Sequence, residues 1–345
     1  MHTATATRIS RKTWVLSAVA VCVTLIVGVC IGAVAIPPGD VIAEIGNHIP
    51  FTHHSTQPSL NSTIIWQLRL PRVILALVVG SMLATAGCSY QGTFRNPLAD
   101  PYLLGVSAGA GLGATVAIVS QHSVAHWVLP IASFAGALIA VALTYSLGRS
   151  ALVGRSSTAL VLAGVAVANL LTAIQTLVQQ RNAEKIREVY AWVLGRLNTA
   201  GWGDVRLVTP YIAICLIVLL RYRRVLDIFA VGDEEALTLG LPVNQARAAV
   251  IIAASLGTAA AVSVTGLIGF VGIIVPHILR LIVGNSYRVL MPLSLIFGGV
   301  FLVLADVIAR TALAPQEIPI GVVTALIGAP FFLYILGSRR SADLT

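Results

Sequence analysis

"RVILALVVGSMLATAGCS", residues 72–89, contains one charged residue, Arg72 at its start. An α-helix rises about 1.5 Å per residue, so about 20 apolar residues cross a hydrocarbon core of roughly 30 Å. Similar runs recur along the chain, and a β-barrel would instead show short segments of alternating polarity. We therefore predict an all-α, polytopic membrane protein with about ten transmembrane helices in one domain over residues 1–345. The expected spans are 14–36, 64–91, 102–119, 127–147, 158–179, 205–220, 248–265, 268–283, 291–309 and 319–337.

The composition supports this class. Hydrophobic residues make up 57% of the chain, charged residues only 10%, and the mean hydropathy is +0.91. A net charge of +9 would indicate a nucleic-acid partner in a soluble protein. In a membrane protein it indicates arginines in loops at the lipid surface, so we expect membrane lipid and no nucleic acid as a partner. The four cysteines lie inside apolar runs without CxxC spacing, which favours packing roles over a metal site or disulfides.

The distribution of basic residues predicts the orientation. The stretch 14–36 imitates a signal peptide but is longer than the usual apolar region of one, so we expect an uncleaved first helix. Of the 22 Lys and Arg residues, fourteen fall in loops on the side of the termini and eight on the other side. The positive-inside rule then places both termini in the cytoplasm. Segments 37–63 and 181–204 become extracytoplasmic loops, the second with an amphipathic helix, and 221–247 becomes a cytoplasmic loop.

That cytoplasmic loop contains "VGDEEALTLGLPVNQAR" (231–247), an unusually acidic stretch for this chain. Asp233 suits a helix N-cap, the two glutamates after it favour the positive end of the helix dipole, and Gly240 suits the C′ stop. A helix this short is unstable alone, so we expect packing by Leu237, Leu239 and Leu241 to hold it. An ordinary connector between helices is the alternative. The caps and charge favour a rigid contact for another protein.

Three arginines stand on the predicted extracytoplasmic side: Arg69, Arg72 and Arg310. One interpretation is that these arginines only anchor helix ends at the membrane–water interface, as arginine commonly does. The other is a basic rim that meets acidic side chains of a docking protein, with Asp306 orienting Arg310 from four residues before it. The residues alone do not choose between these interpretations.

Several catalytic chemistries have no sequence support. The chain has no GxxxxGK[ST] phosphate loop, no HExxH and no GxSxG motif. The glycines of "GVSAGAGLG" (105–113) recur every four residues and indicate close helix packing instead of dinucleotide binding. His277 is a lone histidine, for which packing is favoured over metal ligation. We therefore expect no enzyme activity, no metal site and no cofactor bound by this chain.

Four stretches carry a family resemblance over nearly the whole chain: "RLPRVILALVVGSMLATAGCSYQGTFRNPLADPYLLGVSAGAGLG" (69–113), "GDEEALTLGL" (232–241), "GLIGFVGIIVPHILRL" (266–281) and "ADVIARTALAPQEIPIGVVTALIGAPFFLYIL" (305–336). In length and order they resemble the permease subunits of type II ABC importers for iron–siderophore complexes, haem and cobalamin. The resemblance implies a ten-helix permease in the bacterial cytoplasmic membrane. Its implied partners are two ATPase subunits that bind ATP and Mg²⁺, an extracytoplasmic binding protein, and a second permease, identical or related.

The resemblance also implies roles for particular residues. Arg69, Arg72 and Arg310 match arginines that meet glutamates of the binding protein. The start of the fifth span resembles the cytoplasmic gate, so Ser156 and Ser157, with Ala108, are assigned to the gate or pathway, although the serines also suit helix caps. The residues assigned to ATPase coupling are Asp233, Glu234, Glu235, Leu237, Leu239, Gly240 and Leu241. The loop 37–63 departs from the family by its length and its histidines, His48, His53 and His54; solvated loop histidines are favoured over a metal-sensing role.

The expected function is the import of a ferric siderophore by alternating access, with haem or cobalamin as alternatives. ATP binding by the partner subunits would move the short acidic helix and so open the pathway inward. The rival class is an ion-coupled secondary transporter, which needs ionisable residues near the membrane centre. The candidates, Asp306 and Arg310, lie near a helix end, which disfavours that class.

Overall fold

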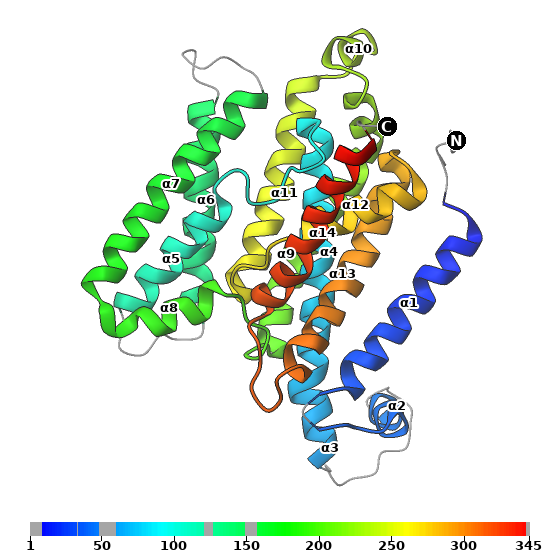
Figure 1. Cartoon of the computed structure of the whole chain (residues 1–345), viewed down its shortest axis with the longest axis vertical. Coiled ribbons are helices and arrows are strands. Elements are labelled where there is room, and N and C mark those ends of the chain that lie inside the picture. The colour runs from blue at the N-terminus through cyan, green and yellow to red at the C-terminus, as the bar shows by residue number, and fades with distance from the viewer. Residues whose placement is uncertain (1–8, 33, 48–59, 121–126, 149–156, 343–345) are drawn as a thin grey trace.

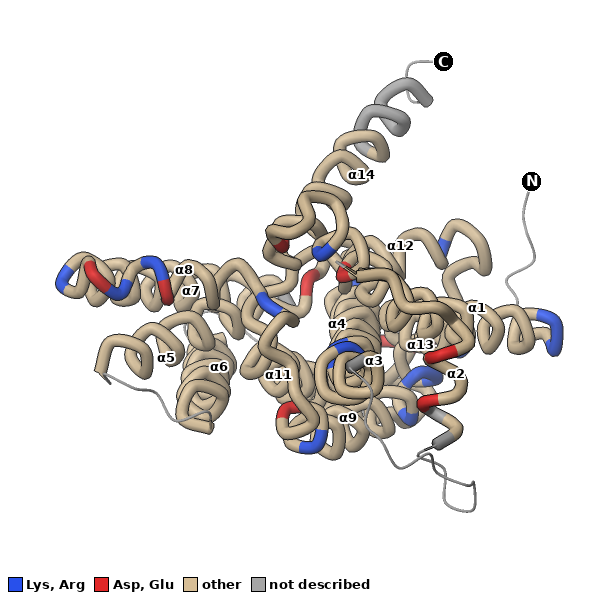
Figure 2. The backbone as a smooth tube through the Cα atoms, turned by 90° about the horizontal axis from the view of Figure 1, so that it is seen from below, with Lys and Arg blue, Asp and Glu red and all other residues tan. Residues whose placement is uncertain are grey.

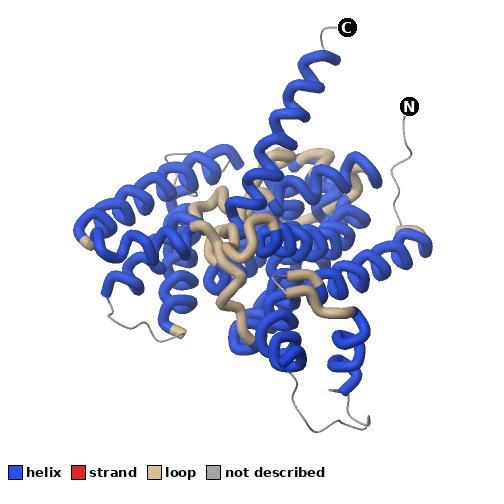
Figure 3. Tube along the Cα trace, turned by 60° about the horizontal axis from the view of Figure 1, so that its bottom comes forward, coloured by secondary structure: helices blue, strands red, loops and turns tan. Residues whose placement is uncertain are grey.

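The computed structural model describes residues 9–32, 34–47, 60–120, 127–148 and 157–342, and all regular structure within these ranges is helical (Figures 1 and 3). The elements are α1 (Arg11–Cys30), α2 (Pro38–Asn47), α3 (Leu60–Thr63), the π-helix η1 (Ile64–Arg69), α4 (Leu70–Phe94), α5 (Val106–Ser120), α6 (Val128–Gly148), α7 (Ser157–Arg181), the 3-10 helix η2 (Ala183–Lys185), α8 (Ile186–Val193), α9 (Trp202–Phe229), α10 (Asp233–Thr238), α11 (Val243–Thr265), α12 (Val271–Val283), α13 (Tyr287–Thr311) and α14 (Ile320–Ala342).

Each of the ten predicted spans coincides with a helix, which confirms the all-helical polytopic fold. Among the described residues, seven helices are long and apolar enough to cross a membrane. The spans predicted at 102–119, 268–283 and 319–337 correspond to shorter apolar helices, Val106–Ser120, Val271–Val283 and Ile320–Ile335. The first of these begins late because Gly105, with φ +78°, ends a turn in which Asp100 accepts a hydrogen bond from the Tyr102 amide.

The structure extends one predicted helix and locates another. We expected the cytoplasmic loop to begin at residue 221, but α9 continues to Phe229. Leu226 and Phe229 are fully buried, so apolar packing extends the helix through "RYRR" (221–224). The segment between the long helices is therefore 230–242. The predicted amphipathic helix is the short α8, whose Trp192 is buried while its Tyr190 is 54% exposed.

The helix α4 forms the centre of the molecule and packs against α9, α11, α12 and α13. Its residues 79–93 are buried throughout. Small residues make these approaches possible: a Cβ atom on Gly87 would overlap the carbonyl oxygen of Gly272 in α12. Membrane helices gain stability from such contact because lipid supplies no hydrophobic drive between them.

A second group, α5, α6 and α7, lies beside this centre and is joined to it through α11 (Figures 1 and 2). Gly109 and Gly113 approach the α6 backbone closely. This confirms the packing interpretation of "GVSAGAGLG". Charged residues are sparse along the helices (Figure 2). Of the cysteines, Cys30, Cys88 and Cys215 are buried as expected, while Cys22 is exposed.

The molecule has two distinct ends (Figure 1). The short helix α10 lies at one end, toward which α4 and α9 run. We call this the α10 end. The helices α3 and α8 lie at the opposite end, where α4 begins and α13 terminates. The predicted docking arginines and the predicted coupling helix are therefore on opposite ends, as the orientation argument requires.

Candidate functional site

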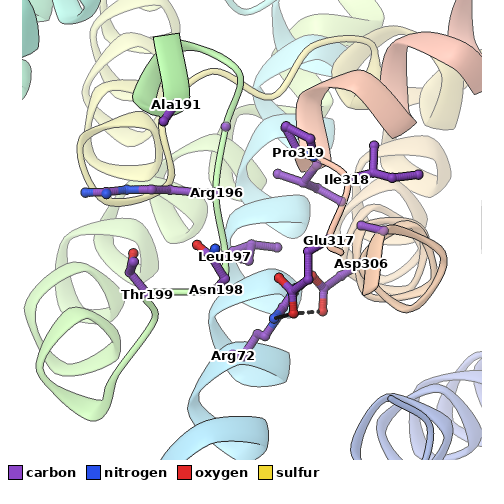
Figure 4. Close-up of a pocket in the computed structure, with 13 residues that line it drawn as sticks. Arg72, Ala191, Arg196, Leu197, Asn198, Thr199, Asp306, Glu317, Ile318 and Pro319 are labelled. Atoms are coloured by element: carbon purple, nitrogen blue, oxygen red, sulfur yellow. Dashed lines mark hydrogen bonds and ion pairs between the residues drawn. The ribbon is translucent and has the colours of Figure 1, made fainter. Parts of the chain in front are cut away.

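A pocket of about 210 Å³ lies at the end opposite α10 (Figure 4). It is formed by the start of α4, the segment that follows α8, and the loop between α13 and α14. Arg72, Asp306 and Glu317 line one part of it, and Asn198 and Thr199 line another. This is where the structure gathers polar groups from distant parts of the sequence.

Arg72 pairs with both carboxylates of this pocket. Its Nε donates to both carboxylate oxygens of Asp306 at 3.0 Å, and its Nη2 donates to Oδ1 at 2.8 Å. Its Nη1 donates to Oε1 of Glu317 at 2.9 Å. Such bidentate guanidinium–carboxylate pairs are strong and directional. Arg72 is thus held between α13 and the loop after it.

The chain places these arginines through an unusual start to α4. Residues Ile64–Arg69 form a π-helix, a form that often occurs at functional sites. Pro71 follows directly after it, inside the continuous helical run Asn61–Phe94, and its missing N–H leaves a carbonyl of the preceding turn without a backbone donor. Trp66 in the π-helix packs on Trp202 at 5.4 Å between ring centroids, and the Trp202 indole donates to the Trp66 carbonyl. The entry of α4 is therefore fixed against α9.

Arg69 and Arg310 are more deeply buried than Arg72, and their docking role stays a prediction. Their exposed fractions are 7% and 5%. Arg69 donates to the carbonyls of Val29 and Cys30, at 2.7 and 3.0 Å, and also to that of Val34. Arg310 donates to the carbonyl of Gly28. The last carbonyls of a helix lack partners within the helix and carry partial negative charge, so these two guanidinium groups cap the C-terminus of α1.

Asp306 was expected to orient Arg310. The structure contains this ion pair, with Nε of Arg310 3.5 Å from Oδ2 of Asp306. The closer partner of Asp306 is nonetheless Arg72. The two residues are 234 positions apart, and the sequence carries no signal that pairs them.

At the other end, α10 contains four of the predicted coupling residues, and Leu239, Gly240 and Leu241 follow it directly (Figure 1). Its N-cap is Gly232 and not Asp233, which makes no side-chain cap. Asp233 instead accepts hydrogen bonds from Arg247 at 2.9 Å and from Arg95 at 3.2 Å. Arg95 and Arg247 are the partners that sequence reasoning missed.

The predicted C-terminal stop of α10 is confirmed. Gly240 has φ +75°, its N–H donates to the carbonyl of Leu237, and the N–H of Leu241 donates to that of Ala236. This is the Schellman arrangement, in which a residue with positive φ, usually glycine, ends the helix.

The predicted packing of this segment is wrong for Leu237 and Leu239, but Leu241 packs against the main core as expected. Leu237 and Leu239 are 61% and 68% exposed, whereas Ala236 is fully buried. The helix rests on the bundle through its small residue, because this lets the backbone approach α9 and α11. Glu234 and Glu235 are also exposed, and the Glu235 carboxylate lies against Gly232 at the start of the helix. An exposed apolar pair on a polar helix is typical of a contact surface.

The remaining predicted residues lie away from both of these surfaces or outside the described residues. Ser156, His48, His53 and His54 lie outside the described residues, and Ser157 begins α7. Ala108 packs in a small cluster with Ala140, Val167 and Leu171. His277 is 6% exposed and packs against the rings of Phe331 and Phe332. Among the described residues, no group of three His, Cys, Asp or Glu side chains could hold a metal ion.

Comparisons with known proteins agree with this architecture. Residues 20–338 match the model of the FecCD transport family. A cobalamin import system permease protein of Halobacterium salinarum is 45% identical over 82% of this chain and 76% of its own length. A hemin transport system permease protein of Yersinia pestis is 38% identical, covering 80% and 84%. An iron chelatin transport system permease protein of Helicobacter pylori, whose assignment is given as probable, is 37% identical, covering 87% and 90%.

A solved structure supports the fold directly. It shows an inward-facing conformation of an ABC transporter assigned to the metal-chelate type, and it superposes with a TM-score of 0.83 at 29% identity. The match covers 95% of this chain and all of that one.

Proposed function

This chain belongs to the FecCD transport family, and we propose that it is the membrane-spanning subunit of an ATP-driven importer for a metal chelate. The family includes permeases for cobalamin, haem and iron chelates. A ferric siderophore is the candidate that we retain from the sequence. Cobalamin is the second candidate, favoured by the 45% identity to the Halobacterium permease.

The observation that carries the mechanism is the surface of α10. Leu237 and Leu239 are exposed, two exposed glutamates precede them, and the helix is tied to α11 through Asp233 and Arg247. We propose that this surface inserts into a groove of a partner ATPase, so that movement on nucleotide binding passes into α11. The α10 end is then cytoplasmic, as are both termini. Hydrolysis of ATP is assigned to the partner, and this chain supplies the pathway.

The opposite end is proposed to receive an extracytoplasmic binding protein. Arg72 is the arginine of the predicted three that lines an open pocket, so the docking role is proposed for it first. Arg69 and Arg310 support that surface from beneath by holding α1 in place. The full assembly would contain two ATPases, the binding protein and a second permease, identical or related. Ser156, Ser157 and Ala108 stay assigned to the gate or pathway as predictions.

The test is uptake in cells that lack this chain. Radiolabelled ferric siderophore, haem and cobalamin are supplied separately, and the chain is expected to restore uptake of one of them. Glu234→Arg with Glu235→Arg should abolish this uptake while the ATPase-free permease still binds the loaded binding protein. Unchanged uptake in that variant contradicts the coupling role. Uptake that persists without any ATPase partner would indicate an ion-coupled transporter instead.

A further inference from the structure

The cluster around Asp306 carries more positive than negative charge at its centre. Arg72 and Arg310 share the single carboxylate of Asp306, at 2.8 and 3.5 Å. Two guanidinium groups and one carboxylate leave one positive charge unmatched. Arg69 lies in the same region, where its charge is directed at helix carbonyls. Buried charges are costly unless they are paired, so this cluster requires a second anion.

Glu317 supplies that anion from the surface (Figure 4). The two carboxylates that pair with Arg72 are not equivalent. The Asp306 side chain is 1% exposed and accepts three hydrogen bonds from Arg72, whereas the Glu317 side chain is 36% exposed and accepts one. Pairs that reach solvent are individually weak, while the removal of one partner from a buried pair is costly. The contact with Glu317 is therefore the one that a competitor can replace.

We infer that Glu317 is an internal substitute for a carboxylate of the docking protein. It occupies the outer edge of Arg72 in the free chain and is exchanged for an aspartate or glutamate of the partner. Asp306 is the positioning residue that keeps the Arg72 guanidinium aimed at this edge. The inference rests on the proposed docking at Arg72. It adds that Glu317 of this chain competes with the partner's carboxylate for Arg72 and so lowers the affinity of docking.

The exchange also has a structural consequence. Glu317 belongs to the loop between α13 and α14, and its pair with Arg72 ties that loop to α4. The same loop is held to α13 through the Ile318 amide and the Ala309 carbonyl at 2.8 Å. A partner carboxylate on Arg72 removes the tie to α4 and keeps the tie to α13. Docking thus loosens the segment that leads into α14.

The first experiment compares Glu317→Gln with the wild type in the complete complex. The probe is the extracytoplasmic binding protein that co-purifies with the tagged permease, and the readout is ATP hydrolysis in nanodiscs against its concentration. At low salt, E317Q is expected to lower the half-saturating concentration about threefold to tenfold and to leave the maximal rate unchanged. Glu188→Gln is the matched control, because it removes one exposed carboxylate from α8 at the same end and should leave the curve unchanged.

The outcomes separate the two proposals. A wild-type complex that no concentration of binding protein stimulates overturns the docking role, and this inference with it. Stimulation of the wild type with a superimposable or weaker E317Q curve overturns the inference alone. A fall in the maximal rate of E317Q would indicate a general structural defect and would also overturn it.

A second measurement uses no partner protein. Thr199 lines the same pocket and is exposed, so Thr199→Cys in a Cys22→Ser background reports the local potential. The rates of modification by a negatively and a positively charged methanethiosulfonate reagent are compared. Removal of the Glu317 charge should raise the ratio of anionic to cationic rates about threefold at low ionic strength. An unchanged ratio would show that Glu317 does not mask Arg72.

Discussion

Asp233 and Arg247 join α10 to α11 through two hydrogen bonds of 2.9 Å from one guanidinium nitrogen to both carboxylate oxygens. Arg247 is 9% exposed and its Cζ lies 5.5 Å from the centre of the Phe229 ring, so α9 also holds it. A short helix cannot transmit force unless it is fixed at its base. This pair contributes to that fixation, together with the Arg95–Asp233 pair and the buried Ala236.

Arg247→Gln is therefore expected to uncouple α10 from α11. The loss of one partly buried pair costs about 1 kcal/mol, which a protein of this size tolerates. Uptake should fall at least about tenfold in energy-dependent assays if coupling requires a rigid link. The control is Arg224→Gln on α9, which removes an exposed charge from the same end. Equal uptake by both variants would show that the pair does not transmit motion.

Leu237→Glu with Leu239→Glu should separate binding from folding. Both leucines are more than half exposed, so the melting temperature of the isolated permease should change by no more than about 2 °C. Co-purification of the ATPase should be lost, because two charges enter an apolar contact. Ala236→Leu is the opposite case: the site is fully buried, and overpacking there should cost about 1–3 kcal/mol. ATPase binding that survives the double substitution would contradict the coupling surface.

Arg69→Gln should release α1. A glutamine is shorter and cannot supply the hydrogen bonds that Arg69 donates to the last two carbonyls of that helix and to the Val34 carbonyl after it. Hydrogen–deuterium exchange in residues 20–32 should rise about tenfold or more, which corresponds to the loss of roughly 1.4 kcal/mol of local stability. Arg206→Gln at the same end is the control, since that side chain is exposed and donates to a carbonyl of its own helix. If hydrogen–deuterium exchange in residues 20–32 is the same in R69Q as in the wild type, Arg69 does not hold α1, and its predicted docking role is favoured.

Gly87→Ala tests the close approach of α4 and α12. A methyl group at this position would overlap the backbone of Gly272, which cannot move as a flexible side chain can. We expect a loss of about 3 kcal/mol or more in unfolding free energy, measured by thermal denaturation in detergent. The matched control is Gly203→Ala, because a Cβ atom there meets nothing within 4 Å. Similar melting temperatures for the two variants would contradict the packing.

Much of the fold follows from the sequence because its signals are local. Apolar runs fix where helices lie, and each predicted span coincides with one. The stop at Gly240 was predictable, since a positive φ at a helix end favours glycine whatever the surroundings. The basic residues predicted that the docking arginines and α10 would lie at opposite ends, as the structure shows.

The tertiary structure decided the partners of the charged side chains. The sequence marks Arg69, Arg72 and Arg310 as notable, but it cannot show that two of them turn inward to α1 while the third meets carboxylates 234 and 245 residues away. It also cannot show that Ala236 and Leu241, and not Leu237 or Leu239, pack against the bundle. Helix position depends on the residues within a few turns. The partner of a long polar side chain depends on which helices pack together and on how they are rotated, and those are properties of the whole bundle.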